Sequence, residues 1–138
     1  MSKPTGKVEV RVEAEVNPTE DAEKVRVAIQ KVFGSISLEL VEEGEYRRLI
    51  GRAEGLEALS RFYDLLRRER ILDAARTVLL KGVQGNRIVF YLNKQVAYVG
   101  HISFSEPYGE SPLGPIHVEI ECDDPKSLID WLTPKTAR

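Results

Sequence analysis

Arginines are concentrated in the middle third of the chain, where their side chains could bind phosphate. Residues 44–82 contain nine basic and six acidic side chains, a net charge of +3 in a chain whose formal net charge is −2. Eight of the nine cations are arginines, and the planar guanidinium suits phosphate better than the point charge of a lysine does. The segment therefore predicts an anion-binding or RNA-binding surface. The candidate phosphate-binding residues are Arg47, Arg48, Arg61, Arg67, Arg68 and, further along the chain, Lys94.

The same arginines could instead be neutralised by acidic neighbours on a helix. Asp64 stands three residues from Arg61 and four from Arg68. Asp73 stands three residues from Arg70. Residues at these spacings are neighbours on a helix surface, and each ion pair contributes about 0.2–0.5 kcal/mol. A solvated helix face crossed by ion pairs is the commoner explanation of such a run, so both interpretations stay open.

Aromatic side chains beside the cations would strengthen the RNA interpretation, because bases stack on them. Phe90 and Tyr91 lie in one expected strand, and Tyr98 and Phe104 lie in the next. Phe90 and Phe104 are expected in the core, whereas Tyr91 and Tyr98 could face either way. The aromatic residues therefore do not decide between the two interpretations.

The chain contains no recognisable catalytic or metal-binding motif. His117 and Cys122 lie five residues apart on an expected strand, so their side chains point to opposite faces and cannot pair; Cys122 is expected to be a core thiol. His117, Glu119 and Glu121 share one face, but same-face neighbours lie about 6–7 Å apart, too far for one metal ion. We expect no metal and no cofactor, and whether the protein is an enzyme stays open.

Length and composition describe an ordinary globular protein. The 138 residues are 42% hydrophobic and 30% charged, which predicts one domain, residues 1–138, that can bury its own core. The net charge of −2 excludes a general attraction to polyanions. One cysteine cannot form an internal disulfide, and no apolar run is long enough to cross a bilayer. These features indicate a soluble cytoplasmic protein.

The first third predicts a strand, a helix and a second strand. Residues 7–16 alternate between apolar and polar side chains without a break, which is typical of a strand with one buried face. Asn17 is a suitable N-cap for a helix with Pro18 in its first turn, and Gly34 is suited to end that helix. Residues 35–41 then predict the second strand.

The middle of the chain predicts a third strand and two helices. Residues 45–53 form the strand. Residues 56–81 have helical periodicity, but their apolar stripe rotates by more than a quarter turn between residues 67 and 70. A straight helix cannot bury both halves of such a stripe. We therefore expect two helices, or one sharply bent helix, joined near Arg68–Arg70.

The last third predicts a hairpin, a loop, a strand and a helix. Residues 87–92 and 95–104 form the hairpin, with Asn93-Lys94 at its tip, and residues 105–115 form the loop. A final strand over residues 116–122 precedes a helix capped by Asp124. The complete order is β-α-β-β-α-α-β-β-β-α. It indicates an α+β fold with a single-layer, mostly antiparallel sheet and helices packed on one face.

Five segments, in order along the chain, resemble a small archaeal family of uncharacterised proteins. They are VEAEVNPTEDAEKV (12–25), RILDAARTVLLKG (70–82), FYLNKQVAYVGHISF (90–104), ESPLGPIHVEIECDDP (110–125) and LIDWLTP (128–134). The resemblance implies a fold similar to that of the large-subunit ribosomal protein that grips 5S RNA. The family that the chain resembles has a sister group of proteins that are predicted to bind RNA and are linked to the exosome. No activity or catalytic residue is attached to the family, so the resemblance assigns no site residues.

Three functional hypotheses follow from these observations. In the first, the protein binds RNA through its arginine-rich helical segment. In the second, it is a non-catalytic homodimer in which that segment meets an acidic surface of the partner, since the first and last thirds are acidic. In the third, it is an enzyme or binder for a small anionic metabolite. The third is the weakest because no general acid, nucleophile or metal set is evident.

Overall fold

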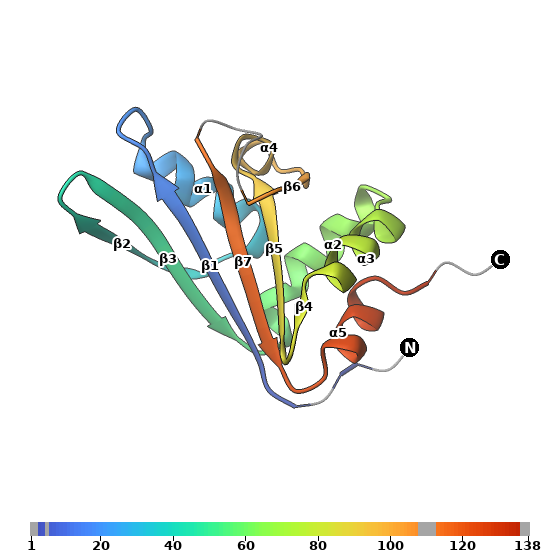
Figure 1. Ribbon diagram of the computed structural model, residues 1–138. Coiled ribbons are helices and arrows are strands. Elements are labelled where there is room, and N and C mark those ends of the chain that lie inside the picture. The colour runs from blue at the N-terminus through green and yellow to red at the C-terminus, as the bar shows by residue number, and fades with distance from the viewer. Residues whose placement is uncertain (1–2, 5, 108–112, 136–138) are drawn as a thin grey trace.

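The fold is built on one antiparallel sheet. The computed structural model describes residues 3–4, 6–107 and 113–135 (Figure 1). Six strands follow one another in the order β2-β3-β1-β7-β5-β4, β6 pairs with β5 alone, and every pairing in these residues is antiparallel. The strands are β1 (Val8–Val16), β2 (Ser37–Glu43), β3 (Tyr46–Glu54), β4 (Val83–Gln84), β5 (Arg87–Asn93), β6 (Phe104–Ser105) and β7 (Pro115–Cys122).

The helices cover one face of this sheet. Buried side chains from helices and strands form one hydrophobic cluster, and in β1 every second residue, from Val8 to Val16, belongs to it. This arrangement confirms the α+β prediction. None of the helices in the described part of the chain has the length and apolar character to cross a membrane. The helices are α1 (Ala22–Phe33), the 3-10 helix η1 (Leu56–Leu59), α2 (Ser60–Arg68), α3 (Leu72–Lys81), α4 (Lys94–Tyr98) and α5 (Pro125–Leu132).

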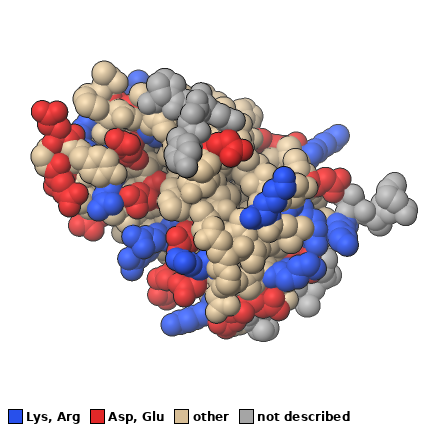
Figure 2. Space-filling view, in the orientation of Figure 1, with Lys and Arg blue, Asp and Glu red and all other residues tan. Residues whose placement is uncertain are grey.

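The other face of the sheet carries polar side chains, and no helix of the described residues packs against it (Figure 1). The register places Arg11 of β1 between Arg52 of β3 and Glu119 of β7. One step along the strands, Glu9 lies between Glu54 and Glu121. In Figure 1 these strands lie in front of α1, so this face of the sheet points toward the viewer. Figure 2, in the same orientation, shows both positive and negative side chains on it. We call this surface the open sheet face.

The first helix begins later than the sequence predicts. Asn17 was the expected N-cap, but α1 starts at Ala22 and its cap is Asp21, whose carboxylate accepts a hydrogen bond from the Glu23 N–H at 2.9 Å. Asn17 instead begins a turn that the Glu20 N–H closes on the Asn17 carbonyl at 2.8 Å. The shift gives Glu20 a structural role outside the helix. The predicted end at Gly34 is confirmed, with φ at 72°.

The predicted break in the long helical segment is confirmed. Helix α2 ends at Arg68 and α3 starts at Leu72. Arg70 lies between them with φ at 57°, in the left-handed region that ends a helix and redirects the chain. Each helix can then bury its own apolar stripe, with Phe62 of α2 and Leu79 of α3 both fully enclosed.

The predicted strand over residues 95–104 and the hairpin tip before it are wrong. The Asn93 side chain accepts a hydrogen bond from the Val96 N–H at 2.9 Å, and this cap starts α4. Gly100, with φ at 89°, follows the helix, and only Phe104–Ser105 pair as a strand. The expected loop over residues 105–115 lies partly outside the described residues, at positions 108–112.

Candidate nucleic-acid interface

Two of the six candidate residues, Arg61 and Arg68, extend into solvent from α2. Both are exposed, and within the described residues neither forms a hydrogen bond or an ion pair. They are seven residues apart, so they lie nearly on one line along the helix, about 10.5 Å from each other. Asp64 lies between them and is exposed. It forms no ion pair with either arginine in the described part of the chain, so the expected neutralisation by this residue is not observed.

Arg67, beside Arg68 in sequence, is held against the protein. Its guanidinium lies 3.4 Å from the centre of the Tyr63 ring, a cation–π contact. The same group donates hydrogen bonds to the carbonyls of Leu132 at 3.0 Å and Trp131 at 3.3 Å. Arg67 therefore joins α2 to α5, on the flank of α2 away from Arg61 and Arg68.

The side chains of Arg47 and Arg48 point to opposite faces of the sheet, since the two are consecutive residues of β3. Arg47 points to the helix side and donates to the carbonyls of Asn17 and Glu20, at 3.4 and 3.3 Å. Arg48 lies on the open sheet face and forms an ion pair with Glu13 at 3.0 Å. The hydrogen bond to Glu13 outweighs desolvation and raises the pKa of the Arg48 guanidinium. These two side chains therefore cannot share one surface with each other, and both already have protein partners.

Lys94 is buried rather than exposed at a hairpin tip, because it lies in the first turn of α4 with 3% of its surface accessible. Its ammonium donates to the Glu20 carboxylate at 2.9 Å and to the carbonyls of Glu15 at 2.7 Å and Leu113 at 2.8 Å. All three donors of the ammonium are used. In this structure Lys94 has no surface or donor left for a phosphate.

The Glu20 carboxylate is held ionised by this network. Burial raises the pKa of Glu20, but hydrogen bonds from the Asn17 N–H and the Lys94 ammonium oppose it, and the net pKa lies below the ordinary value of 4.5. The pair joins the end of β1, the turn before α1, the start of α4 and Leu113, which lies two residues before β7. Sequence reasoning missed it because the two partners lie 74 residues apart.

The residues that were considered for a metal site or a nucleophile are Cys122 and the acidic side chains of β1 and β7. Strands β1 and β7 are neighbours, as a metal site on their outer face would need. Even so, no group of three His, Cys, Asp or Glu side chains in the described residues is arranged to hold a metal ion. Cys122 is buried in the core, and burial raises the pKa of its thiol, which keeps it protonated and unreactive.

Comparison with protein families and curated proteins finds clear relatives. A family model described as RNA binding matches residues 9–122. A UPF0201 protein of Sulfurisphaera tokodaii is 51% identical over 127 residues, which cover 92% of this chain and 88% of the relative. The UPF0201 protein PH1010 of Pyrococcus horikoshii is 44% identical over 128 residues, which cover 93% and 91% of the two chains.

Solved structures agree with the fold. The crystal structure of a UPF0201 protein from Methanococcus jannaschii matches with a TM-score of 0.83 and 38% identity, over 91% of this chain and 99% of that one. A DUF54 protein, SSO0741 from Sulfolobus solfataricus, matches with a TM-score of 0.68 over 91% of this chain and 96% of its own, at 14% identity. The second likeness shows a shared fold alone.

Proposed function

The chain belongs to the UPF0201 protein family, and from this premise we propose that it binds structured RNA through the α2 surface, which we define as Arg61 and Arg68. The observation that carries the proposal is that these two guanidinium groups are exposed and have no partner within the described residues. A guanidinium that is already paired must lose that partner before it binds a phosphate, whereas a free one exchanges only water.

The family comparison supports the same class of ligand. The matching family model is described as RNA binding, and its matched range, residues 9–122, includes all of α2. Side chains on one helix face can contact phosphates across a groove of a folded RNA, because A-form RNA is recognised mainly by its shape and backbone. The separation of about 10.5 Å between Arg61 and Arg68 lets them contact two different phosphates.

The test is the salt dependence of binding to a folded RNA such as a hairpin. Affinity should fall as the salt concentration rises, because each contacted phosphate releases counterions. Arg61→Ala/Arg68→Ala should lower the affinity and reduce the slope of log affinity against log salt by about 1.4–1.8, which corresponds to two phosphate contacts. Binding that does not change with salt, or a double variant with the wild-type slope, would refute the proposal.

The matched control is Arg11→Ala/Arg52→Ala. These two arginines are also exposed, neighbouring and without an ion pair among the described residues, but they lie on the open sheet face. The substitution removes the same charge from the opposite side of the molecule. Its affinity and slope should stay close to the wild-type values. An equal loss in both double variants would mean that only the net charge matters.

A homodimer is the second candidate, and the acidic row on the open sheet face favours it. Glu54, Glu9 and Glu121 lie side by side across β3, β1 and β7, which places negative charge on the side of the molecule opposite the α2 surface. A second copy could pair its α2 surface with this row. Light scattering at low and high salt tests the candidate: a dimer that dissociates as salt rises supports it, and a monomer under both conditions excludes it.

A further inference from the structure

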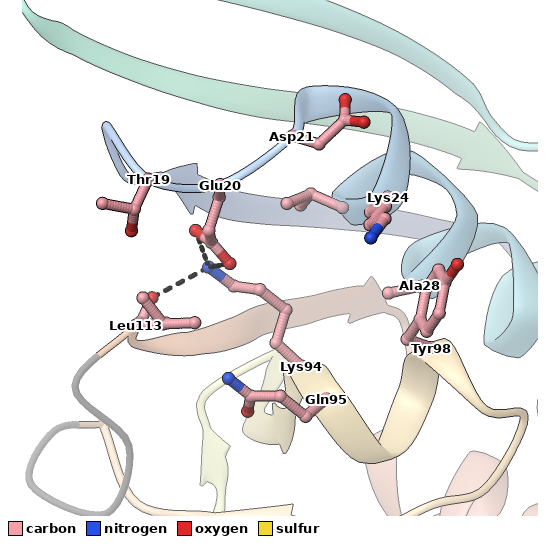
Figure 3. A pocket seen from close by; sticks show the side chains of 10 residues that line it. Thr19, Glu20, Asp21, Lys24, Ala28, Lys94, Gln95, Tyr98 and Leu113 are labelled. Atoms are coloured by element: carbon pink, nitrogen blue, oxygen red, sulfur yellow. Dashed lines mark hydrogen bonds and ion pairs between the residues drawn. The ribbon is translucent and has the colours of Figure 1, made fainter.

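A pocket of about 350 Å³ opens between α1 and α4, away from the residues that the proposed function uses (Figure 3). The Tyr98 ring stands at one end of it beside Ala28, and the Lys94–Glu20 pair closes the other end. The volume is at the lower end of the range for small-molecule pockets. The pocket is thus large enough for one planar group beside the tyrosine.

The pocket combines an enclosed apolar wall with an exposed aromatic ring. Val25 and Ala28 of α1 are 3% and 1% exposed, whereas Tyr98 is 40% exposed. The next residue in the chain, Val99, is 61% exposed. A large exposed aromatic ring above an apolar wall is the arrangement on which nucleic-acid bases stack.

The two acidic and two basic side chains that line the pocket balance in charge, and one lysine among them is exposed and available to a phosphate. Lys94 and Glu20 neutralise each other at the closed end. The Asp21 carboxylate is negative and is partly occupied by capping α1. Lys24 also lines the pocket; it is exposed and has no ion-pair or hydrogen-bond partner among the described side chains. Lys31 follows two turns later on α1, and a Cβ built on Gly100 would lie 4.0 Å from its Cδ.

The two lysines therefore flank the exposed tyrosine. They are seven residues apart on one helix, which separates them by about 10.5 Å along its axis. Beyond Lys31, His101 contacts the Glu69 carboxylate at 2.7 Å, and Glu69 directly follows Arg68 of the α2 surface. Lys24 and Lys31 thus place two positive charges along α1, and the His101–Glu69 contact links the residue after Gly100 to the end of α2.

We propose that this pocket receives one unpaired base of a bound RNA, stacked on Tyr98, with the flanking phosphates on Lys24 and Lys31. The inference rests on the proposed function and adds the kind of RNA: one with an unpaired nucleotide beside the segment held by α2. A polymer fits the two separated lysines better than a free nucleotide does, because a single phosphate would contact only one of them. Thr19 and Gln95 also line the pocket.

The test measures binding of a short single-stranded oligoribonucleotide that carries one 2-aminopurine. Tyr98→Leu keeps an apolar side chain against Ala28 but removes the ring, and it should weaken binding about tenfold. Tyr98→Phe keeps the ring and should bind like wild type. Stacking should also quench the 2-aminopurine fluorescence with wild type and with the Phe variant, but not with the Leu variant.

The matched control is Tyr46→Leu, since Tyr46 is 43% exposed, about as much as Tyr98, but lies on the β2–β3 hairpin. It should bind the oligoribonucleotide like wild type. Thermal unfolding of both Leu variants shows whether either has lost its fold, and the Phe variant tests the ring independently of that.

The outcomes separate this inference from the proposed function. If Tyr98→Leu binds and quenches like wild type while Arg61→Ala/Arg68→Ala loses the folded RNA, the inference is wrong and the proposed function stands. If a free nucleoside monophosphate binds the wild type as tightly as the oligoribonucleotide does, the pocket serves a small ligand and the inference is wrong. If the wild type binds neither RNA, the proposed function fails and this inference fails with it.

Discussion

The α2 surface and the buried Lys94–Glu20 pair, which we call the Lys94 site, both contain positively charged side chains. They differ in exposure and in the number of partners that those side chains have. Arg61 and Arg68 are exposed and have no partner among the described residues, whereas the Lys94 ammonium is buried and bound to three protein segments. The first arrangement contributes little to folding and leaves charge available to a ligand. The second contributes to folding and leaves no donor available. A cation counted in the sequence is therefore a candidate for binding only if the fold leaves it unpaired.

The largest effect on stability is expected from Lys94→Met. The substitution keeps a long apolar stem but leaves the Glu20 carboxylate, 11% exposed, without its cation. Removing one partner of a buried ion pair costs about 3–5 kcal/mol, because the other charge stays buried. Urea unfolding should show a decrease of this order, partly recovered in Lys94→Met/Glu20→Gln. A loss below about 1 kcal/mol would mean that the Lys94 site resembles the α2 surface after all.

The neighbours Arg67 and Arg68 provide the sharpest comparison within one helix. Arg67→Ala removes the contact with the Tyr63 ring and the bonds to two carbonyls of the segment 131–132. It should lower the free energy of unfolding by about 1–2 kcal/mol. Arg68→Ala should change it by less than about 0.5 kcal/mol. In RNA binding the order should be reversed, with the larger loss of affinity in Arg68→Ala. Equal effects of the two variants on stability or on affinity would contradict the contrast between paired and unpaired arginines.

A smaller effect is expected from acid. The pKa of Glu20 is lowered in the folded protein, so its ionised form contributes stability at and above pH 4.5. That contribution should be lost as the pH falls below about 4.5, toward the lowered pKa of the folded state. Unfolding curves recorded between neutral pH and pH 3 should show a smaller decrease for Glu20→Gln than for wild type. A decrease of the same size in both would exclude Glu20 as a source of acid sensitivity.

Periodic and local signals predicted most of the fold. The unbroken alternation of residues 7–16 located β1 to within one residue, and the rotation of the apolar stripe located the break at Arg70. The face to which each side chain of a strand points follows from the sheet period of two, which also separates Arg47 from Arg48. The likeness to a ribosomal protein stays a prediction.

A local helix cap and a long-range ion pair together explain the error over residues 95–104. The segment 95–104 contains β-branched and aromatic residues that favour a strand, but the Asn93 cap and the burial of Lys94 against Glu20 stabilise a helix there. The residues around Lys94 cannot show that its ammonium will meet the Glu20 carboxylate, because the two lie 74 residues apart in the sequence. For the same reason the sequence could not show which cations were free, and the pocket beside Tyr98 was not predicted.

Arginine-specific chemical modification, with and without a folded RNA and read by mass spectrometry, tests the central claim most directly. The reagent reports the accessibility of each guanidinium in one experiment. Without RNA, Arg61, Arg68, Arg11 and Arg52 should all react, since all four are exposed. With RNA, the account predicts protection of Arg61 and Arg68 and continued modification of Arg11 and Arg52. Protection of the open sheet face, with α2 left as reactive as before, would contradict it.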